Sequence, residues 1–249
     1  MSNLIEHPTN MNSIENRHHE LVNRLRSAEV RFGRTLGSVC LVAVSKTRCP
    51  EAIRAIAALR QKDFGENQLQ EALGKIEILS DLDCTWHFIG SIQTNKCRDI
   101  AAHFDWVHSV DSLKIAKRLS NLRPATAVPL NIFLQVNLQG EATKSGIVPG
   151  ELTSLASSVH ELPNLQLRGL MAIPVPECNF ERQRKVFNKL RELQNGLNQA
   201  LDLTLDCLSM GMTDDLEAAV AEGATHVRVG TAIFGPRNSH KQSESADLE

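Results

Sequence analysis

The stretch VCLVAVSKTRCPEAIRAIAALRQKDFGE, residues 39–66, contains the alternation that decides the fold. An almost continuous apolar run (39–45) precedes a polar turn, a segment with apolar residues at helical spacing (50–61) and a second short run (63–66). A strand that is apolar on both faces is typical of a parallel sheet covered by helices. The stretch therefore predicts a strand, a helix and a second, parallel strand.

The same alternation continues along the chain. Strand-like runs occupy residues 39–45, 63–66, 85–90, 105–110, 129–137, 165–173, 205–211 and 225–230, with helical segments between them. Eight strand–helix units in succession close into a barrel. We therefore predict an α/β fold in which residues 12–237 form a single (β/α)8 barrel of the TIM type. An open, doubly wound sheet is the alternative, because one misassigned strand would change the count.

The two ends of the chain differ from the middle. Residues 12–33 place apolar residues at helical spacing and end at a glycine, which predicts an extra N-terminal helix. Residues 1–11 and 238–249 are polar and lack periodicity, so we expect a flexible N-terminal extension and a disordered polar tail. A long helix with a clean apolar stripe is predicted for residues 180–201.

The composition is that of an ordinary soluble chain of 249 residues with a formal net charge of -2. Such a charge provides no field that favours nucleic acid or an anionic membrane. The sequence has no leader-like start and no apolar run long enough for a membrane helix, so we expect a cytoplasmic protein. The cysteines form no C-x-x-C pair, which favours reduced thiols over a zinc site or a disulfide framework: Cys40, Cys49, Cys84, Cys97, Cys178 and Cys207.

Lys46 directly follows the first predicted strand. In both candidate folds ligands bind at the carboxyl ends of the strands. Burial there would lower the pKa of the Lys46 amine and make it a nucleophile toward carbonyl groups. The alternative is a side chain that extends from the strand end to solvent.

Two glycine-containing turns follow the seventh and eighth predicted strands. In LSMGMTDD (208–215) a strand runs into hydroxyl and glycine residues and then into a helix start, which favours anion binding. VRVGTAIFG (227–235) resembles the phosphate site that barrels often build after these strands. The alternatives are a helix cap at Thr213 and plain glycine turns. The two turns together predict one phosphate site.

Three further polar side chains stand on predicted strands or directly after them. Asn67 follows the second strand, and His87, in the third strand, either lines the barrel mouth or is a hydrogen-bonded core residue. Arg228 lies between two valines on the last strand, so strand alternation directs it into the mouth. A shift of one residue in register would instead place it outside, beside Glu217.

The chain contains, in this order, the motifs AVSKT, FGEN, WHFIGSIQTNK, RGLMAI, SMGMTDDLEAA and RVGTAIFG. In the order and spacing of these motifs the chain resembles the pyridoxal phosphate homeostasis proteins, also called proline synthase co-transcribed proteins. The resemblance implies a single-domain barrel similar to the N-terminal domain of alanine racemase. It also implies that Lys46 carries pyridoxal 5'-phosphate (PLP) as a Schiff base.

The resemblance implies roles for further residues. The phosphate would be held by Ser209, Met210, Gly211, Thr213, Gly230 and Thr231, and Arg228 would face the pyridine nitrogen; Asn67, His87 and Met171 complete the expected cofactor-binding set. Two positions depart from the family, which usually has Ser at Thr213 and commonly Tyr at Gln68. Lys144 matches a lysine that the family carries in this loop, and a part in cofactor transfer is the hypothesis for it.

Two classes of function remain, a carrier of PLP and a PLP-dependent enzyme. The chain contains no tyrosine, which removes the standard two-base racemase, and the residues after 237 are too few and too polar for the second domain of such enzymes. An aldolase-like reaction would need an acid–base partner for Lys46, and Glu66 is the nearest candidate. We expect a monomeric carrier, with no metal and no catalytic residues, that supplies PLP-dependent apoenzymes. A weak amino-acid racemase or decarboxylase-like activity is the alternative.

Overall fold

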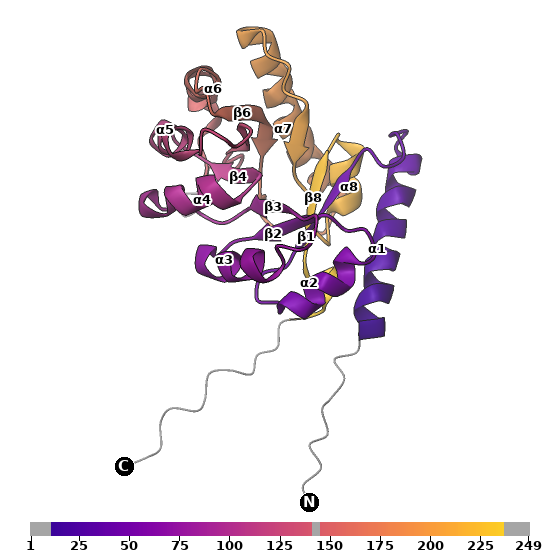
Figure 1. Cartoon of the computed structure of the whole chain (residues 1–249). Coiled ribbons are helices and arrows are strands. Elements are labelled where there is room, and N and C mark those ends of the chain that lie inside the picture. Colours follow the sequence, from indigo (N-terminus) through magenta and orange to yellow (C-terminus); the bar gives the residue numbers. More distant parts are fainter. Residues whose placement is uncertain (1–10, 141–144, 237–249) are drawn as a thin grey trace, which may run out of the picture.

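The computed structural model describes residues 11–140 and 145–236 of the chain. Parallel strands β1 to β8 form a closed barrel in sequence order, with β8 paired to β1 (Figure 1). This confirms the predicted barrel and shows that the open sheet is wrong. The strands are β1 (Cys40–Val44), β2 (Asp63–Glu66), β3 (Thr85–Phe88), β4 (Trp106–Val110), β5 (Leu130–Gln135), β6 (Leu165–Met171), β7 (Cys207–Ser209) and β8 (His226–Val229).

Helices connect the strands and cover the outside of the barrel. They are α2 (Pro50–Ala57), α3 (Leu69–Ile78), α4 (Cys97–His103), α5 (Leu113–Leu122), α6 (Leu152–His160), α7 (Phe180–Leu201) and α8 (Leu216–Ala221), with 3-10 turns η1 (Thr94–Lys96) and η2 (Pro149–Glu151). Local sequence sets two of their starts: the Ser112 and Asn179 side chains accept hydrogen bonds from the first turns of α5 and α7. The bounds predicted for the long helix are confirmed by α7.

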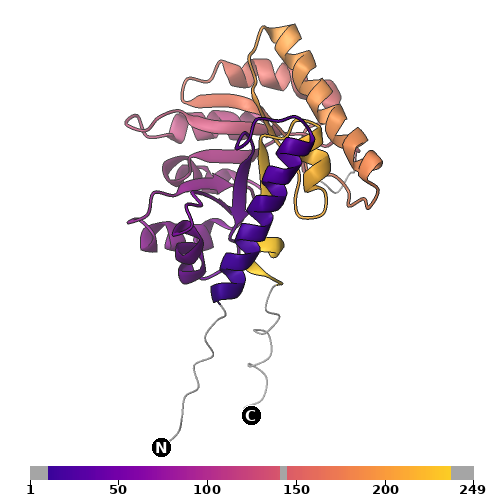
Figure 2. The ribbon, with the colours of Figure 1, turned by 90° about the vertical axis from the view of Figure 1, so that its right-hand side faces the viewer.

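The predicted N-terminal helix, α1 (Met11–Arg31), completes the outer layer. The helix after β8, α9 (Thr231–Phe234), is too short to cover the barrel, and α1 packs against α2, α8 and α9 (Figures 1 and 2). Arg24 holds α1 to α8 through two contacts of 2.6 Å with the Glu217 carboxylate. The Arg17 Nε group donates to the Ile233 carbonyl at 2.8 Å and holds α1 to α9. The extra helix therefore covers the seam between β8 and β1.

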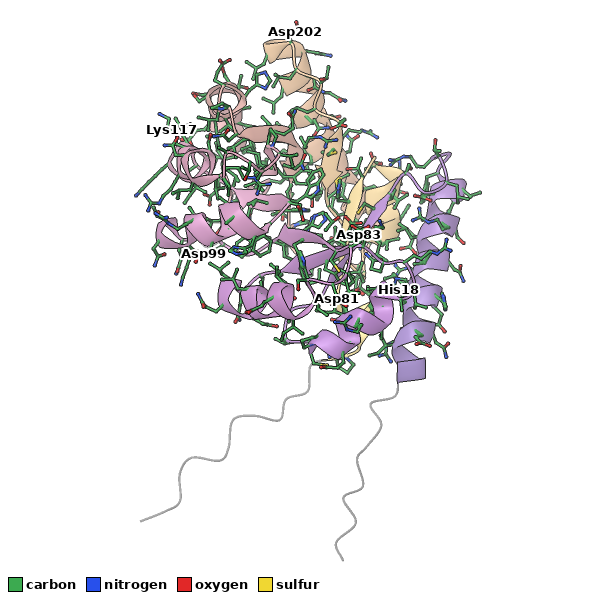
Figure 3. All side chains as sticks on the ribbon, in the orientation of Figure 1. His18, Asp81, Asp83, Asp99, Lys117 and Asp202 are labelled. Atoms are coloured by element: carbon green, nitrogen blue, oxygen red, sulfur yellow. The ribbon has the colours of Figure 1, made fainter. Side chains whose placement is uncertain are left out.

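Strand alternation divides the core into an outer layer, between the strands and the helices, and the interior of the barrel. Val227 and Val229 belong to the large apolar cluster between strands and helices, so their neighbours on β8 point into the barrel. A smaller cluster of Phe133, Met171 and Cys207 fills the interior, together with three buried imidazoles, those of His87, His108 and His226. Charged side chains such as Asp99 and Lys117 lie on the outer helices (Figure 3).

The predicted polar tail (238–249), the predicted N-terminal extension (1–11) apart from Met11, and Lys144 lie outside the described residues. Met11 is the first residue of α1 and not part of an extension. All six cysteines are free thiols, as predicted. Among the described residues, no helix is long and apolar enough to cross a membrane. No cluster of three or more His, Cys, Asp or Glu side chains within the same ranges is placed to hold a metal ion.

Candidate functional site

Lys46 stands at the mouth of the barrel, two residues after β1, and is half-buried. The ends of β1 and β8 approach closely there, because a β-carbon added to Gly230 would lie 3.1 Å from the Val44 carbonyl oxygen. A side chain at this position would crowd the end of β1, so glycine suits the close approach of the two strands. Lys46 follows Val44 by two residues and therefore belongs to the same edge as the turn at Gly230 and Thr231.

The backbone on both sides of Lys46 is held by helix α3. The Lys75 ammonium donates to the Ser45 carbonyl at 2.7 Å, and the Glu71 carboxylate accepts from the Thr47 N–H at 2.5 Å. Lys75 and Glu71 also pair with each other at 2.5 Å. Thr47 has φ of 63°, a strained conformation for a β-branched residue. One ion pair therefore holds the strained turn that presents Lys46.

Glu66 lies behind this turn, between the strands and α3. Its neighbour Gly65 faces the interior, so Glu66 faces outward, where its Oε1 accepts from Ser45 Oγ at 2.6 Å and from Lys75 at 2.7 Å. Burial raises the pKa of Glu66, although the charge of Lys75 opposes the shift. The carboxyl group considered as an acid–base partner for Lys46 is thus part of a structural cluster on the helix side.

Arg228 points into the barrel, as predicted, and is buried. Its Nη1 donates to Ser209 Oγ at 2.6 Å and its Nη2 to the Ala172 carbonyl at 3.0 Å. Burial lowers the pKa of Arg228 to about 10, so it remains a cation at neutral pH. The alternative register is wrong, because Glu217 pairs with Arg24 instead.

His87 is a core residue, the second of the two interpretations that the sequence left open. It is fully buried, and both ring nitrogens have protein partners: Nδ1 lies 2.9 Å from His108 Nε2, and Nε2 lies 2.9 Å from Asp63 Oδ1. His108 Nδ1 lies 2.8 Å from Ser209 Oγ. The structure therefore places His87 inside the barrel, with no side-chain surface at the mouth.

The turn after β7 is built around Gly211. This residue has φ of 93°, and a β-carbon there would lie 2.5 Å from that of Ala219. Asp215 is the cap residue of α8, and its Oδ1 accepts from the Met212 N–H at 2.6 Å. The capping alternative for Thr213 is therefore wrong, and Thr213 is a half-buried residue of the turn.

The remaining predicted residues lie at the mouth, in the barrel interior or, for the Met210 side chain, in the outer core. The Met210 side chain is buried in the outer core and its N–H donates to the His226 carbonyl at 3.1 Å, while Met171 is fully buried in the interior cluster. Thr231 is exposed. Asn67 is half-buried, and its Oδ1 is a buried oxygen with no hydrogen-bond partner among the described residues. An oxygen in this state is suited to a ligand with a donor group.

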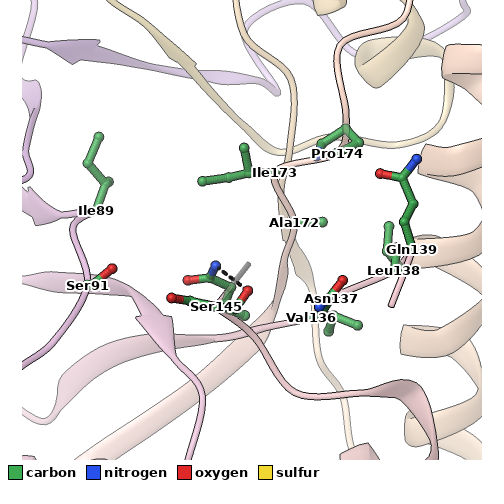
Figure 4. A pocket seen from close by; sticks show the side chains of 11 residues that line it. Ile89, Ser91, Val136, Asn137, Leu138, Gln139, Ser145, Ala172, Ile173 and Pro174 are labelled. Carbon is green, nitrogen blue, oxygen red and sulfur yellow. Dashed lines mark hydrogen bonds between the residues drawn. The ribbon is translucent and has the colours of Figure 1, made fainter. Parts of the chain in front are cut away.

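A pocket of about 270 Å³ opens at the carboxyl ends of β3, β5 and β6 (Figure 4). Ala172, whose carbonyl accepts from Arg228, forms part of its wall, and Gln135 Nε2 donates to the Ser145 carbonyl at 3.0 Å across one side. The lining residues are Ile89, Ser91, Gln135, Val136, Asn137, Leu138, Gln139, Ser145, Ala172, Ile173 and Pro174.

Sequence reasoning missed most of this wall and the interior residue His108. The polar residues that follow β3 and β5 were an available signal, since both strands end at the mouth. His108 stands in WVHSV as His87 stands in TWHF, so both histidines were visible as polar residues within apolar strands.

The closed barrel, with a lysine after β1 and a buried arginine on β8, places the chain in the class of (β/α)8 barrel proteins. The chain matches the family described as alanine racemase, N-terminal domain, over residues 22–238. A pyridoxal phosphate homeostasis protein of Pseudomonas aeruginosa is 58% identical over 215 residues, covering 86% of this chain and 92% of that protein. This chain belongs to the family of pyridoxal phosphate homeostasis proteins.

Two further relatives extend the comparison. The pyridoxal phosphate homeostasis protein of Escherichia coli is 46% identical over 235 residues, covering 93% of this chain and 100% of that protein. The solved structure of PipY from Synechococcus elongatus, with PLP bound, is 41% identical with a TM-score of 0.76, covering 84% of this chain and 98% of that chain. The family and the fold are thus shared over nearly the whole described chain.

Proposed function

We propose that this chain binds PLP through a Schiff base on Lys46 and carries or buffers the cofactor with little or no catalysis. The observation that supports the proposal most directly is the position of Lys46, on a strained turn held at the barrel mouth next to the glycine turn that follows β8. PipY, a 41% identical relative, has PLP bound. We infer that PLP-dependent apoenzymes receive the cofactor.

The residues present fit PLP. Gly211, Thr213, Gly230 and Thr231 stand on the two turns and would hold the phosphate, mainly through backbone N–H groups. Gly230 leaves room where a side chain would crowd the Val44 carbonyl, and the buried Oδ1 of Asn67 lacks a partner among the described residues. PLP supplies an aldehyde that reacts with amines and a ring that withdraws electrons.

The surroundings of the mouth favour a carrier over an enzyme. We propose that Arg228 faces the pyridine nitrogen; because a guanidinium only donates, it would leave that nitrogen unprotonated and the ring a weaker electron acceptor. Glu66, the acid–base candidate near Lys46, is hydrogen-bonded to Ser45 and Lys75. The chain has no tyrosine to act as a second base.

An observation that favours a weak amino-acid-processing activity is the pocket of about 270 Å³ beside Ala172, which is large enough for a small amino acid. The enzyme alternative requires turnover, so incubation with L-alanine and chiral analysis of the product tests it. Racemisation at enzymatic rates would overturn the carrier proposal.

The Schiff base is tested by borohydride reduction of the PLP-loaded protein and peptide mass mapping. We expect a visible absorption band that disappears on reduction and an adduct on Lys46. Lys46→Ala should abolish the adduct while the protein stays folded, and Lys96→Ala, a change on η1, is the matched control that should retain it. An adduct on Lys96 or Lys144 in the wild type would contradict the proposal.

A further inference from the structure

We infer that a hydrogen-bonded chain with one fixed direction runs through the barrel interior and positions Arg228 at the mouth; its members are Asp63, His87, His108 and Ser209. The direction of this chain is a property of the protein alone. Its effect on PLP rests on the proposed function.

The two ends of the chain set its direction. A guanidinium has no acceptor, so Arg228 Nη1 donates and Ser209 Oγ accepts at 2.6 Å. Burial alone would raise the pKa of Asp63, but its contacts with His87 and Cys40 and the nearby His226 together outweigh burial and hold that pKa below the ordinary value. Asp63 is therefore a carboxylate, which only accepts, and His87 Nε2 donates to it at 2.9 Å.

The positions of the remaining protons follow from the ends. A neutral imidazole has one N–H donor and one acceptor nitrogen. In the neutral form of His87, Nε2 carries the proton, so Nδ1 accepts from the Nε2–H of His108 at 2.9 Å. Burial lowers the pKa of His108 well below its ordinary value, so this ring is neutral and its Nδ1 accepts the Ser209 hydroxyl proton at 2.8 Å.

This direction assigns Ser209 a role that differs from the sequence expectation. Its hydroxyl proton is directed to His108 and a lone pair to Arg228, and the side chain is fully buried. The hydroxyl is therefore engaged away from the phosphate turn. Aligned hydrogen bonds polarise one another, so the chain strengthens the acceptor that holds the buried guanidinium. Ser209 and His108 are positioning residues for Arg228.

His226 is the matched control inside the same barrel. It is a buried imidazole on β8 whose ring centre lies 6.0 Å from that of His108. Its Nδ1 lies 2.9 Å from Thr225 Oγ1, and it belongs to none of the four hydrogen bonds of the chain. Replacing it should change the packing of the interior, and it removes none of the four hydrogen bonds.

The direction is tested in the PLP-free protein by nitrogen NMR of labelled histidine side chains. At a pH well above the ordinary pKa of an imidazole, we expect His87 and His108 to carry their protons on Nε2. In Asp63→Asn the new amide can donate, so the fixed direction should be lost and a second protonation pattern should appear. A His108 proton on Nδ1 in the wild type would overturn the inference, and so would an unchanged pattern in Asp63→Asn.

The positioning role is tested by titrating PLP and pyridoxal into His108→Phe and His226→Phe. We expect His108→Phe to weaken both ligands roughly tenfold and to shift the visible band, and His226→Phe to stay within about twofold of wild type. Equal effects of the two variants would overturn the role.

If His108→Phe does not fold, His108→Gln replaces it. Wild-type binding with an unshifted band in that variant would also overturn the positioning role. Absence of PLP binding by the wild type would refute the proposed function, while the NMR result would still decide the direction.

Discussion

The Lys75 ammonium donates to the Ser45 carbonyl at 2.7 Å, and Ser45 is the residue directly before Lys46. The same ammonium contacts Glu66 and Glu71, and Glu71 holds the N–H of Thr47 on the other side. The side chains of one helix therefore fix the backbone from which the candidate nucleophile projects. A lysine presented in this way loses little freedom when it reacts, because its main chain is already ordered.

Lys75→Met should destabilise the protein strongly. The substitution leaves the buried Glu66 carboxyl without its cation, and breaking a buried pair on one side costs about 3–5 kcal/mol. Urea unfolding measures the change. Lys62→Met, which removes the exposed pair between Lys62 and Asp83, is the control and should change stability little. Equal losses in the two variants would contradict the structural role of Lys75.

Glu66 should contribute a pH-dependent part of the stability. Burial raises its folded pKa above the ordinary value of 4.5, so the stability linked to its protonation is fully present below pH 4.5 and is lost as the pH rises through the folded pKa. Glu66→Gln removes the ionisation and should flatten this part of the profile. Urea unfolding of both proteins at several pH values above 4.5 measures it, and parallel profiles would refute the assignment.

Thr213→Ala and Ser209→Ala should affect the binding of different parts of the cofactor, the phosphate and the ring. If Thr213 contacts the phosphate, its loss should weaken PLP by about 1–2 kcal/mol and leave pyridoxal nearly unaffected. Ser209 acts through Arg228, so Ser209→Ala should weaken both ligands to a similar extent. Equilibrium titrations with PLP and pyridoxal test both variants. If Ser209→Ala weakens the binding of PLP more than that of pyridoxal, the Ser209 hydroxyl contacts the phosphate instead.

Arg228→Glu should make the bound ring a better electron acceptor. A carboxyl group facing the pyridine nitrogen favours its protonated form, whereas the guanidinium does not. Deuterium exchange at the α-carbon of added alanine, followed by NMR, should be negligible in the wild type and faster in the variant. Arg98→Glu, an exposed change on α4, is the control and should behave like the wild type. Fast exchange in the wild type would argue for an enzyme.

Two glycine substitutions should change stability in opposite directions. Gly211→Ala forces a side chain into a left-handed position against Ala219, and we expect a loss of about 1–3 kcal/mol together with weaker PLP binding. Gly196→Ala lies in the open on α7 and should stabilise the helix by about 0.5–1 kcal/mol. Thermal unfolding tests both, and a tolerated alanine at Gly211 would show that the turn adapts.

The sequence by itself determined the barrel and the edge at which the site lies. Apolar periodicity is a local property, so β1 to β8 and the bounds of α7 follow from short windows of residues. Alternation along a single strand was sufficient to turn Arg228 inward, because its two valine neighbours need the outer core. Lys46 was visible for the same reason, as a polar residue at the end of a buried strand.

Only the tertiary structure decided the partners of these residues. Ser209 lies 101 positions from His108 in the chain and Lys75 lies 30 positions from Ser45, and no periodic pattern records either pair. The sequence therefore left open whether His87 lines the mouth or belongs to the core, and it assigned the Ser209 hydroxyl to phosphate. Closure of the barrel brings the inward side chains of different strands within hydrogen-bond distance, and burial then requires each polar group to find a partner there.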